Sequence, residues 1–138
     1  MENFNKELQK LSALKQNIYE LRKLYDEINS ADIKKLLKDI IVISDKIYKE
    51  VVVDTNKLYK LERFNNYYIV TVQKIIKRYI SLSKNMIITD QNQEIFIKIE
   101  EFLKNVAVSF NSLYKSLYTN EIIDLDLEMK VMEKEMKI

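Results

Sequence analysis

The chain has 138 residues with a formal net charge of +2, and it contains no Gly, Pro, Cys or His. Without Gly and Pro, a β-rich fold would have to build its tight turns from Asn and Asp, so the composition favours an all-α protein. Without Cys and His, disulfides, thiolate nucleophiles and imidazole-based catalysis or metal binding are excluded.

A long first helix is predicted over residues 3–28, because apolar residues recur there in steps of three and four for more than three heptads. The stripe comprises Phe4, Leu8, Leu11, Leu14, Ile18, Leu21, Leu24, Tyr25 and Ile28. A stripe this apolar must be covered, and the short break at Asn29 and Ser30 favours packing back onto the next helix of the same chain. The alternative is that residues 1–29 form an interaction arm that pairs with another chain.

A second helix is predicted to begin after Ser30, a good N-cap residue, with Asp32 in its first turn. Its buried face is expected to consist of Ile33, Leu36, Leu37, Ile40, Ile43, Ile47 and Val51. The β-branched runs 40–43 and 51–53 also suit strands, but the helical spacing continues through both of them. Asp54 and Thr55 form the next break and are expected to cap the third helix.

The third predicted helix, residues 56–84, is the centre of the expected architecture. Its stripe comprises Leu58, Leu61, Asn65, Tyr68, Val72, Ile75, Tyr79 and Leu82, of which we predict Leu61, Tyr68, Val72 and Ile75 to be core. Four further apolar residues lie off this stripe: Phe64, Tyr67, Ile69 and Val70. The helix should therefore touch more than one neighbour. Asn65 must be hydrogen-bonded if it is buried, and such residues often fix the register of helices.

A fourth helix is predicted over residues 91–118, with Thr89 or Asp90 as its cap. Its stripe is Ile95, Ile99, Phe102, Val106, Phe110, Leu113 and Leu117. After a break at residues 119–120, Asp124 or Asp126 is expected to cap a short last helix. The apolar residues of that helix are Leu127, Val131, Met132 and Met136. We thus expect one all-α domain over residues 1–138, an antiparallel bundle of four long helices plus a short C-terminal helix.

Charge is distributed unevenly along the chain. Residues 54–88 hold seven basic groups against two acidic ones, whereas residues 121–138 hold six acidic groups against three lysines. The simplest account is that the last helix packs beside the third helix and partly neutralises it.

The segment from Arg63 to Thr71 is the most distinctive in the chain. It matches an Arg-Phe-x-Asn-Tyr-Tyr-Leu-Pro-Thr-Thr-like stretch at Arg63, Phe64, Asn66, Tyr67, Tyr68 and Thr71. The ending, with Asp124, Asp126, Glu128 and Met132, looks like an acidic C-terminal helix that accompanies this stretch. In both motifs the chain resembles the 5-bromo-4-chloroindolyl phosphate hydrolysis protein family, over residues 35–138. The first helix would then lie largely outside the resemblance, and residues 30–138 would form the family-like bundle.

The family name implies phosphatase activity, and relatives occur beside toxic-anion-resistance proteins. Phosphomonoester hydrolysis needs a nucleophile or metal-bound water, an acid for the leaving group and cations for the phosphate. With His and Cys absent, Asp124, Asp126 and Glu128 are the only candidates for a metal site, and they are weak ones. Acids at a helix N-terminus are ordinary capping residues, so we expect no catalytic residue, metal or cofactor here.

Five residues are candidates for binding an anion or a partner: Arg63, Asn66, Tyr67, Lys74 and Arg78. Lys74 and Arg78 are four residues apart on one helix face and repel each other slightly unless something negative lies between them. A solvated basic face, or pairing with the last helix, is the simpler interpretation. Tyr67 and Tyr68, with Phe64, are better explained as core residues, in which the tyrosines keep their hydroxyl groups near polar partners.

The function we expect is that of a non-enzymatic interaction or scaffold protein, with a link to toxic-anion resistance that the resemblance implies. A phosphatase with an acidic metal site and an anion-binding sensor remain open as alternatives. The partner would be another protein or a second copy, with room for a homodimer contact around Phe64, Tyr67 and Val70. Nucleic acid is not expected at a net charge of +2. The chain has no apolar stretch long enough for a transmembrane segment and no secretory signal, so we expect a bacterial, cytoplasmic protein; peripheral membrane association stays open.

Overall fold

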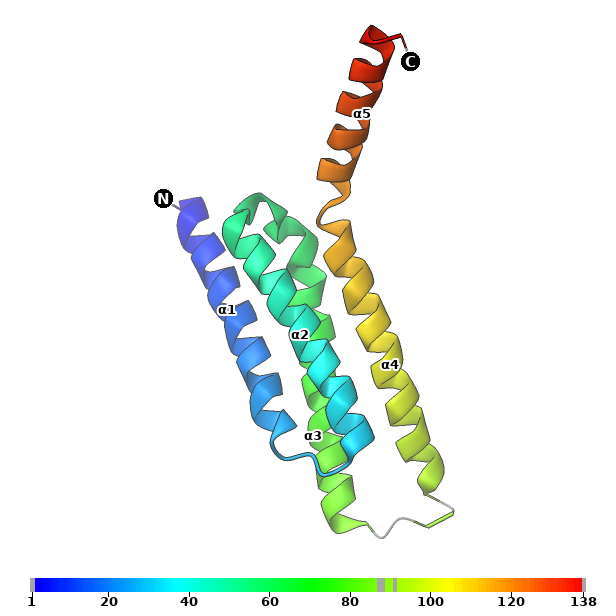
Figure 1. Ribbon diagram of the computed structural model, residues 1–138. Coiled ribbons are helices and arrows are strands. Elements are labelled where there is room, and N and C mark those ends of the chain that lie inside the picture. Colours follow the sequence, from blue (N-terminus) through cyan, green and yellow to red (C-terminus); the bar gives the residue numbers. More distant parts are fainter. Residues whose placement is uncertain (1, 87–88, 91, 138) are drawn as a thin grey trace.

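The computed structural model describes residues 2–86, 89–90 and 92–137, and every regular element within them is helical (Figure 1). The α-helices are α1 (Glu2–Tyr25), α2 (Ala31–Val53), α3 (Ile69–Asn85), α4 (Gln93–Ser116) and α5 (Thr119–Glu135). Two further helical segments join α2 to α3: the 3₁₀-helix η1 (Thr55–Leu61) and the π-helix η2 (Phe64–Tyr68). The predicted all-α class is confirmed, as is the bundle of long antiparallel helices followed by one C-terminal helix.

Helices α1 to α4 form the bundle, and each reverses the direction of the one before it (Figure 1). Helix α2 packs most closely on α4 and on α1, and α1 also packs on α3, whereas α3 touches α4 much less. The first helix therefore packs on its own chain, as expected from the short break after it. None of the described helices is long and apolar enough to cross a membrane.

The core lies along the axis of these four helices. Its largest fully buried side chains include Leu14, Ile18, Leu21, Leu37, Ile40, Ile47, Phe64, Ile69, Ile76, Leu103 and Leu117. Phe64 and Phe110 meet edge to face near its centre, with ring centroids 4.7 Å apart. On the predicted stripe of α1, Leu14, Ile18, Leu21 and Leu24 are buried and Tyr25 is half-buried, whereas Phe4 and Leu8 are exposed.

Side-chain caps set two of the predicted helix starts. The hydroxyl oxygen of Ser30 accepts a hydrogen bond from the N–H of Ile33 at 3.4 Å, and the carboxylate of Asp54 accepts one from the N–H of Asn56 at 3.2 Å. The predicted cap of the fourth helix is wrong. Asn92, rather than Thr89 or Asp90, occupies the N-cap position of α4, and its side-chain oxygen accepts a hydrogen bond from the N–H of Thr89 at 2.7 Å. Residue 91, the predicted start of this helix, lies outside the described residues.

The third predicted helix is a continuous helical run, but its geometry is not uniform. In η2 the N–H of Ile69 bonds to the C=O of Phe64, five residues back, so this turn contains one extra residue. The extra residue rotates the rest of the helix relative to a regular α-helix. Of the four core predictions, Leu61 and Val72 are confirmed, whereas Tyr68 is 45% exposed. Ile75 is only half-buried, and its neighbour Ile76 takes the core position.

Two predictions about the last helix are wrong. Helix α5 begins at Thr119, so Asp124 and Asp126 lie in its interior and do not cap it. It leaves the bundle beyond the end of α4 and none of its residues is buried (Figure 1). The expected packing along the third helix is therefore wrong, because contact with the basic segment is made by the first turn of α5, where Glu121 forms an ion pair with Lys57 at 2.5 Å.

Candidate functional site

A polar network holds the π-helical turn against α1. Asn65 is 9% exposed, and the side-chain amide of Asn17 donates to its C=O at 3.1 Å and to its side-chain oxygen at 2.8 Å. In a regular α-helix the C=O of Asn65 would accept from the N–H of Ile69, but that N–H bonds to Phe64 instead. Asn17 thus donates a hydrogen bond to a carbonyl that has lost its α-helical partner in the π turn.

Two more hydrogen bonds extend this network along α1 and α3. The amide of Gln73 donates to the C=O of Asn17 at 2.9 Å, and the amide of Asn65 donates to the C=O of Lys10 at 3.4 Å. Asn65 and Gln73 are both buried, so each needs these partners. The network fixes the register of the π turn against α1, the role expected for Asn65 from the sequence.

The opposite side of the same turn faces solvent. The guanidinium group of Arg63 lies 4.3 Å from the ring centroid of Tyr67 and 5.7 Å from that of Tyr68. The two tyrosine rings meet edge to face at 5.8 Å. Arg63, Tyr67 and Tyr68 are all exposed, so the interpretation of Tyr67 and Tyr68 as core residues is wrong. Their rings instead form a cation–π cluster with Arg63 on the surface.

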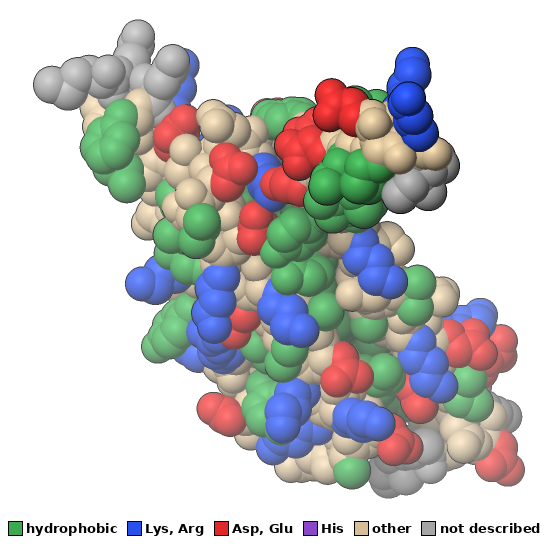
Figure 2. Space-filling model, turned by 45° about the horizontal axis from the view of Figure 1, so that its top comes forward, with side chains coloured by type: hydrophobic (Ala, Val, Ile, Leu, Met, Phe, Trp, Pro, Cys, Tyr) green, Lys and Arg blue, Asp and Glu red, His purple; other side chains and the backbone are tan. Residues whose placement is uncertain are grey.

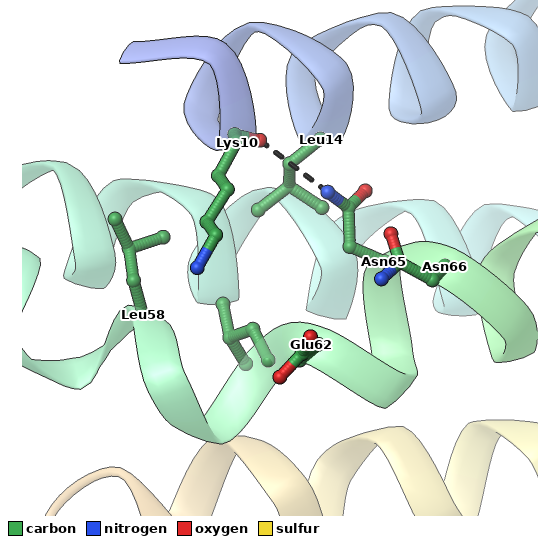
Figure 3. Close-up of a pocket in the computed structure, with 7 residues that line it drawn as sticks. Lys10, Leu14, Leu58, Glu62, Asn65 and Asn66 are labelled. Carbon is green, nitrogen blue, oxygen red and sulfur yellow. Dashed lines mark hydrogen bonds between the residues drawn. The ribbon is translucent and has the colours of Figure 1, made fainter. Parts of the chain in front are cut away.

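A small pocket opens beside this turn, between α1 and the η1–η2 segment (Figure 3). Lys10 and Leu14 line it from α1, and Leu58, Leu61, Glu62, Asn65 and Asn66 line it from the other side. Its volume of about 80 Å³ is well below the 300–1,000 Å³ typical of ligand pockets. It brings the candidate Asn66 beside Lys10 and Glu62, a pair of opposite charges and not a cluster of cations.

The remaining basic candidates lie elsewhere on the long helix. Lys74 and Arg78 are exposed on α3, one turn apart. Arg63 precedes Lys74 by about three helical turns, or roughly 16 Å along the axis, so it is not adjacent to them. The five candidates therefore fall into two groups, with Arg63, Asn66 and Tyr67 around the π turn and Lys74 and Arg78 farther along α3.

The acidic candidates lie on α5. Asp124 and Asp126 are two residues apart and so project from different sides of the helix. Asp126 forms an ion pair with Lys130 at 2.8 Å. Within the part of the chain that the structure describes, no group of three or more acidic residues is gathered as a metal site would require.

A charged cluster that the sequence did not reveal lies where α4 meets α5. Lys57, only 8% exposed, contacts Glu50 at 2.7 Å and Glu121 at 2.5 Å, and its ammonium group lies 4.7 Å from the ring centroid of Tyr118. The hydroxyl of Tyr118 donates to Glu50 at 2.7 Å and lies 3.2 Å from the hydroxyl of Tyr114. In the sequence Lys57 is one of seven basic groups between residues 54 and 88, and nothing local marks it as buried.

These contacts keep the cluster charged at neutral pH. Hydrogen bonds from Lys57 and Tyr118 lower the pKa of Glu50. Burial opposes the charge of Lys57, but hydrogen bonds to Glu121 and Glu50 outweigh it and raise its pKa. Hydrogen bonds to Tyr114 and Glu50, together with burial, raise the pKa of Tyr118. The cluster therefore attaches the first turn of α5 to the bundle through charged groups.

Comparison with known protein families identifies the family of the chain. The sequence model of the 5-bromo-4-chloroindolyl phosphate hydrolysis protein family matches residues 5–132. The chain belongs to this family. Searches of curated proteins and of solved structures found no match. Because the family match starts at residue 5, the interpretation that the first helix lies largely outside the resemblance is wrong.

The two motifs of this 5-bromo-4-chloroindolyl phosphate hydrolysis family member lie in two different places. The Arg63–Thr71 motif forms the π turn with its surface cluster, and the acidic ending forms most of α5. Large apolar side chains accompany the acids of α5 and are 48–63% exposed: Ile122, Ile123, Leu125, Leu127, Met129, Val131 and Met132, with Met136 directly after the helix. Figure 2 shows hydrophobic and acidic side chains together on this projecting helix, at the upper right.

Proposed function

We propose that this family member is a non-enzymatic interaction protein, and that α5 is the element that engages another protein surface. We place this role in the context of toxic-anion resistance, because the family resemblance implies that relatives occur beside toxic-anion-resistance proteins. The bundle acts as the rigid body from which α5 projects, and the charged cluster around Lys57 attaches the two.

The observation that carries this proposal is the burial of α5. The helix is 17 residues long and has no buried residue, although seven of its side chains are apolar. A helix in a protein obtains most of its stability from packing its apolar face. Contiguous apolar surface of this kind on a monomer marks an interaction site.

The arrangement of the polar candidates supports this proposal over the phosphatase alternative. A phosphatase would bring a nucleophile or a metal-bound water, an acid and cations to one point. Asp124 and Asp126 lie on different sides of α5. Arg63 is stacked on Tyr67, about three turns from Lys74 and about four turns from Arg78. We therefore assign these residues to surface interactions.

A turnover assay separates the two functions. The purified full chain is incubated with a chromogenic phosphate ester, with and without Mg²⁺, Mn²⁺ or Zn²⁺, beside a mock purification from cells that lack the protein. We expect no turnover above the mock sample. Turnover that copurifies with the chain and is lost in Asp124→Asn or Asp126→Asn would overturn the proposal in favour of a phosphatase.

The anion-sensor alternative has one supporting observation, the exposed Lys74 and Arg78 one turn apart. Its test is the melting temperature in phosphate compared with chloride at the same ionic strength. We expect equal melting temperatures, because the groove that Arg78 lines is mainly apolar and Lys74 is not among its lining residues. Stabilisation by phosphate that disappears in Arg78→Gln would establish a sensor.

A further inference from the structure

A second unfilled apolar surface lies between α3 and α4. It is a groove of about 370 Å³ lined by Ile75 and Leu82 of α3 and by Ile95, Ile99 and Phe102 of α4. Arg78 and Lys98 lie at its edges, and both are exposed. The groove exists because α3 and α4 make little direct contact, while the π turn rotates Ile75 out of the core. Ile95 is 44% exposed there, although its spacing is that of a core residue.

The apolar residues of α5 include a stripe whose spacing and charge suit this groove. Steps of three and four connect its members Ile122, Leu125, Met129, Met132 and Met136, the spacing of a helix that packs on other helices. Acids flank this stripe on both sides, with Glu133 and Asp126 on one side and Glu128 and Glu121 on the other. Asp126 is paired with Lys130 at 2.8 Å and Glu121 with Lys57 at 2.5 Å, so Glu128 and Glu133 carry the charge that the stripe offers to a partner.

We propose that the stripe of α5 packs into the α3–α4 groove of a second copy of this chain, and that the second copy returns the same contact. This assignment rests on the proposed interaction role of α5 and names its partner. Charge complementarity selects the groove. The acids beside the stripe would face Lys74 and Arg78 on the α3 edge and Lys98, which shares its charge with Glu94 at 3.3 Å, on the α4 edge.

Pairing of α5 with α5 of another copy is disfavoured for the same reason. Acids on both sides of both stripes would place rows of like charge opposite each other, which destabilises helix pairing. An anionic membrane surface would repel the same acids. The groove offers α5 both an apolar floor and positive edges.

Helix α5 is too short to fill the groove of its own chain, so we assign it to the groove of another copy. The groove spans Ile95–Phe102, at the start of α4, whereas α5 begins beyond the end of α4 and points away from it (Figure 1). If α5 folded back along α4, its 17 residues would extend about 25 Å and only its tip would reach Phe102. In a pair with twofold symmetry, each α5 reaches the groove of the other copy and the assembly closes.

The first test is the oligomeric state of the full chain by sedimentation velocity and light scattering. We expect a dimer at micromolar concentration, and Met129→Glu should weaken it roughly 30-fold or more, as for a central interface residue. Leu127→Glu is the matched control, because it places the same charge on the other face of α5 at a similarly exposed position, and it should leave the dimer intact. A monomeric full chain, or equal disruption by both variants, would overturn the proposal.

The second test exchanges the charges. The pair Lys74→Glu/Arg78→Glu and the pair Glu128→Lys/Glu133→Lys should each give a folded monomer, because α5 and the groove then carry the same sign. Mixing the two variants should restore a dimer that contains one chain of each. All four side chains are exposed, so circular dichroism should report an unchanged fold. Two monomers that stay monomeric on mixing would overturn the second copy as the partner.

These outcomes are independent of the enzyme assay. Turnover that depends on Asp124 or Asp126 would remove the proposed non-enzymatic role whatever the oligomeric state. A monomer without turnover would remove the second copy as the partner of α5, and with it this inference alone.

Discussion

At the scale of single residues, buried polar groups decide how the helices align. Asn65 is buried, and its cost of burial is offset by hydrogen bonds with Asn17 and Lys10. Lys57 is the corresponding case for charge, since Glu50 and Glu121 compensate its burial. In both places a few polar contacts between elements that are distant in sequence select one packing arrangement.

Removing the side-chain amide of Asn65 should destabilise the fold. We expect Asn65→Ala to lower the free energy of unfolding by about 1–3 kcal/mol, because the amide of Asn17 and the C=O of Lys10 lose partners. Urea denaturation measures this change. The neighbouring exposed residue provides the control, as Asn66→Ala should stay within about 0.5 kcal/mol of wild type. Equal losses in the two variants would contradict the assigned role of the network.

The charged cluster should make stability depend on pH on the acid side. The pKa of Glu50 is lowered in the folded state, so its stabilising contribution is present above the usual glutamate value of 4.5 and is lost as pH falls through the lower folded value. Glu50→Gln lacks this contribution at every pH. We therefore expect a shallower loss of stability below pH 4.5 in Glu50→Gln than in wild type, measured by thermal melts across that range.

The control for this experiment is Glu101→Gln, an exposed substitution on α4 away from the cluster. It should follow the wild-type pH dependence. If Glu50→Gln and wild type lose stability in parallel, then Lys57 and Tyr118 do not stabilise the charged form of Glu50.

At the scale of elements, the π turn determines which side of α3 enters the core. The strict three/four stripe continues to Ile75 and Leu82, yet the extra residue in η2 turns Ile69, Ile76 and Ile80 inward. Ile75 and Leu82 of the predicted stripe line the α3–α4 groove, whereas Val72 and Tyr79 remain buried. One added residue in a single turn thus moves part of a predicted core stripe to the surface of the bundle.

Two adjacent isoleucines test this register. Ile76 is fully buried, so Ile76→Ala should cost about 2–5 kcal/mol of unfolding free energy, whereas Ile75→Ala should cost less than about 1.5 kcal/mol. Both variants are compared in the Met129→Glu background, so that any effect of Ile75 on dimerisation does not enter the comparison. A larger loss for Ile75→Ala than for Ile76→Ala would restore the uninterrupted α-helical register.

At the scale of the whole molecule, the chain consists of a packed bundle and a helix that the bundle does not cover. Helix α5 contacts the bundle chiefly through the first-turn charge of Glu121, and its apolar residues remain in solvent. Such a helix should open more easily than α1–α4, because local stability follows the number of buried apolar contacts.

Hydrogen exchange measures this difference in the intact protein. In the Met129→Glu variant we expect the amides of α5 to exchange much faster than those of α1–α4. In wild type at concentrations where the dimer forms, the same amides should become protected, and Leu127→Glu should show the wild-type pattern. Protection of α5 that is identical in Met129→Glu and wild type would mean that α5 is stabilised within its own chain.

The all-α class, the breaks at residues 29–30 and 54–55 and the family motifs could be predicted from the sequence alone. They depend on composition, capping residues and apolar spacing, which act locally. Only the tertiary structure decided the register of α3, the course of α5 and the cluster around Lys57. A π turn changes the helical period on which stripe analysis depends, and Asn17 stabilises it from another helix. Whether the acidic helix α5 packs on the basic helix α3 depends on where α4 ends, because α5 begins there. Lys57 contacts Glu50 and Glu121 only when α2, η1 and α5 have come together, so no local sequence pattern predicts that contact.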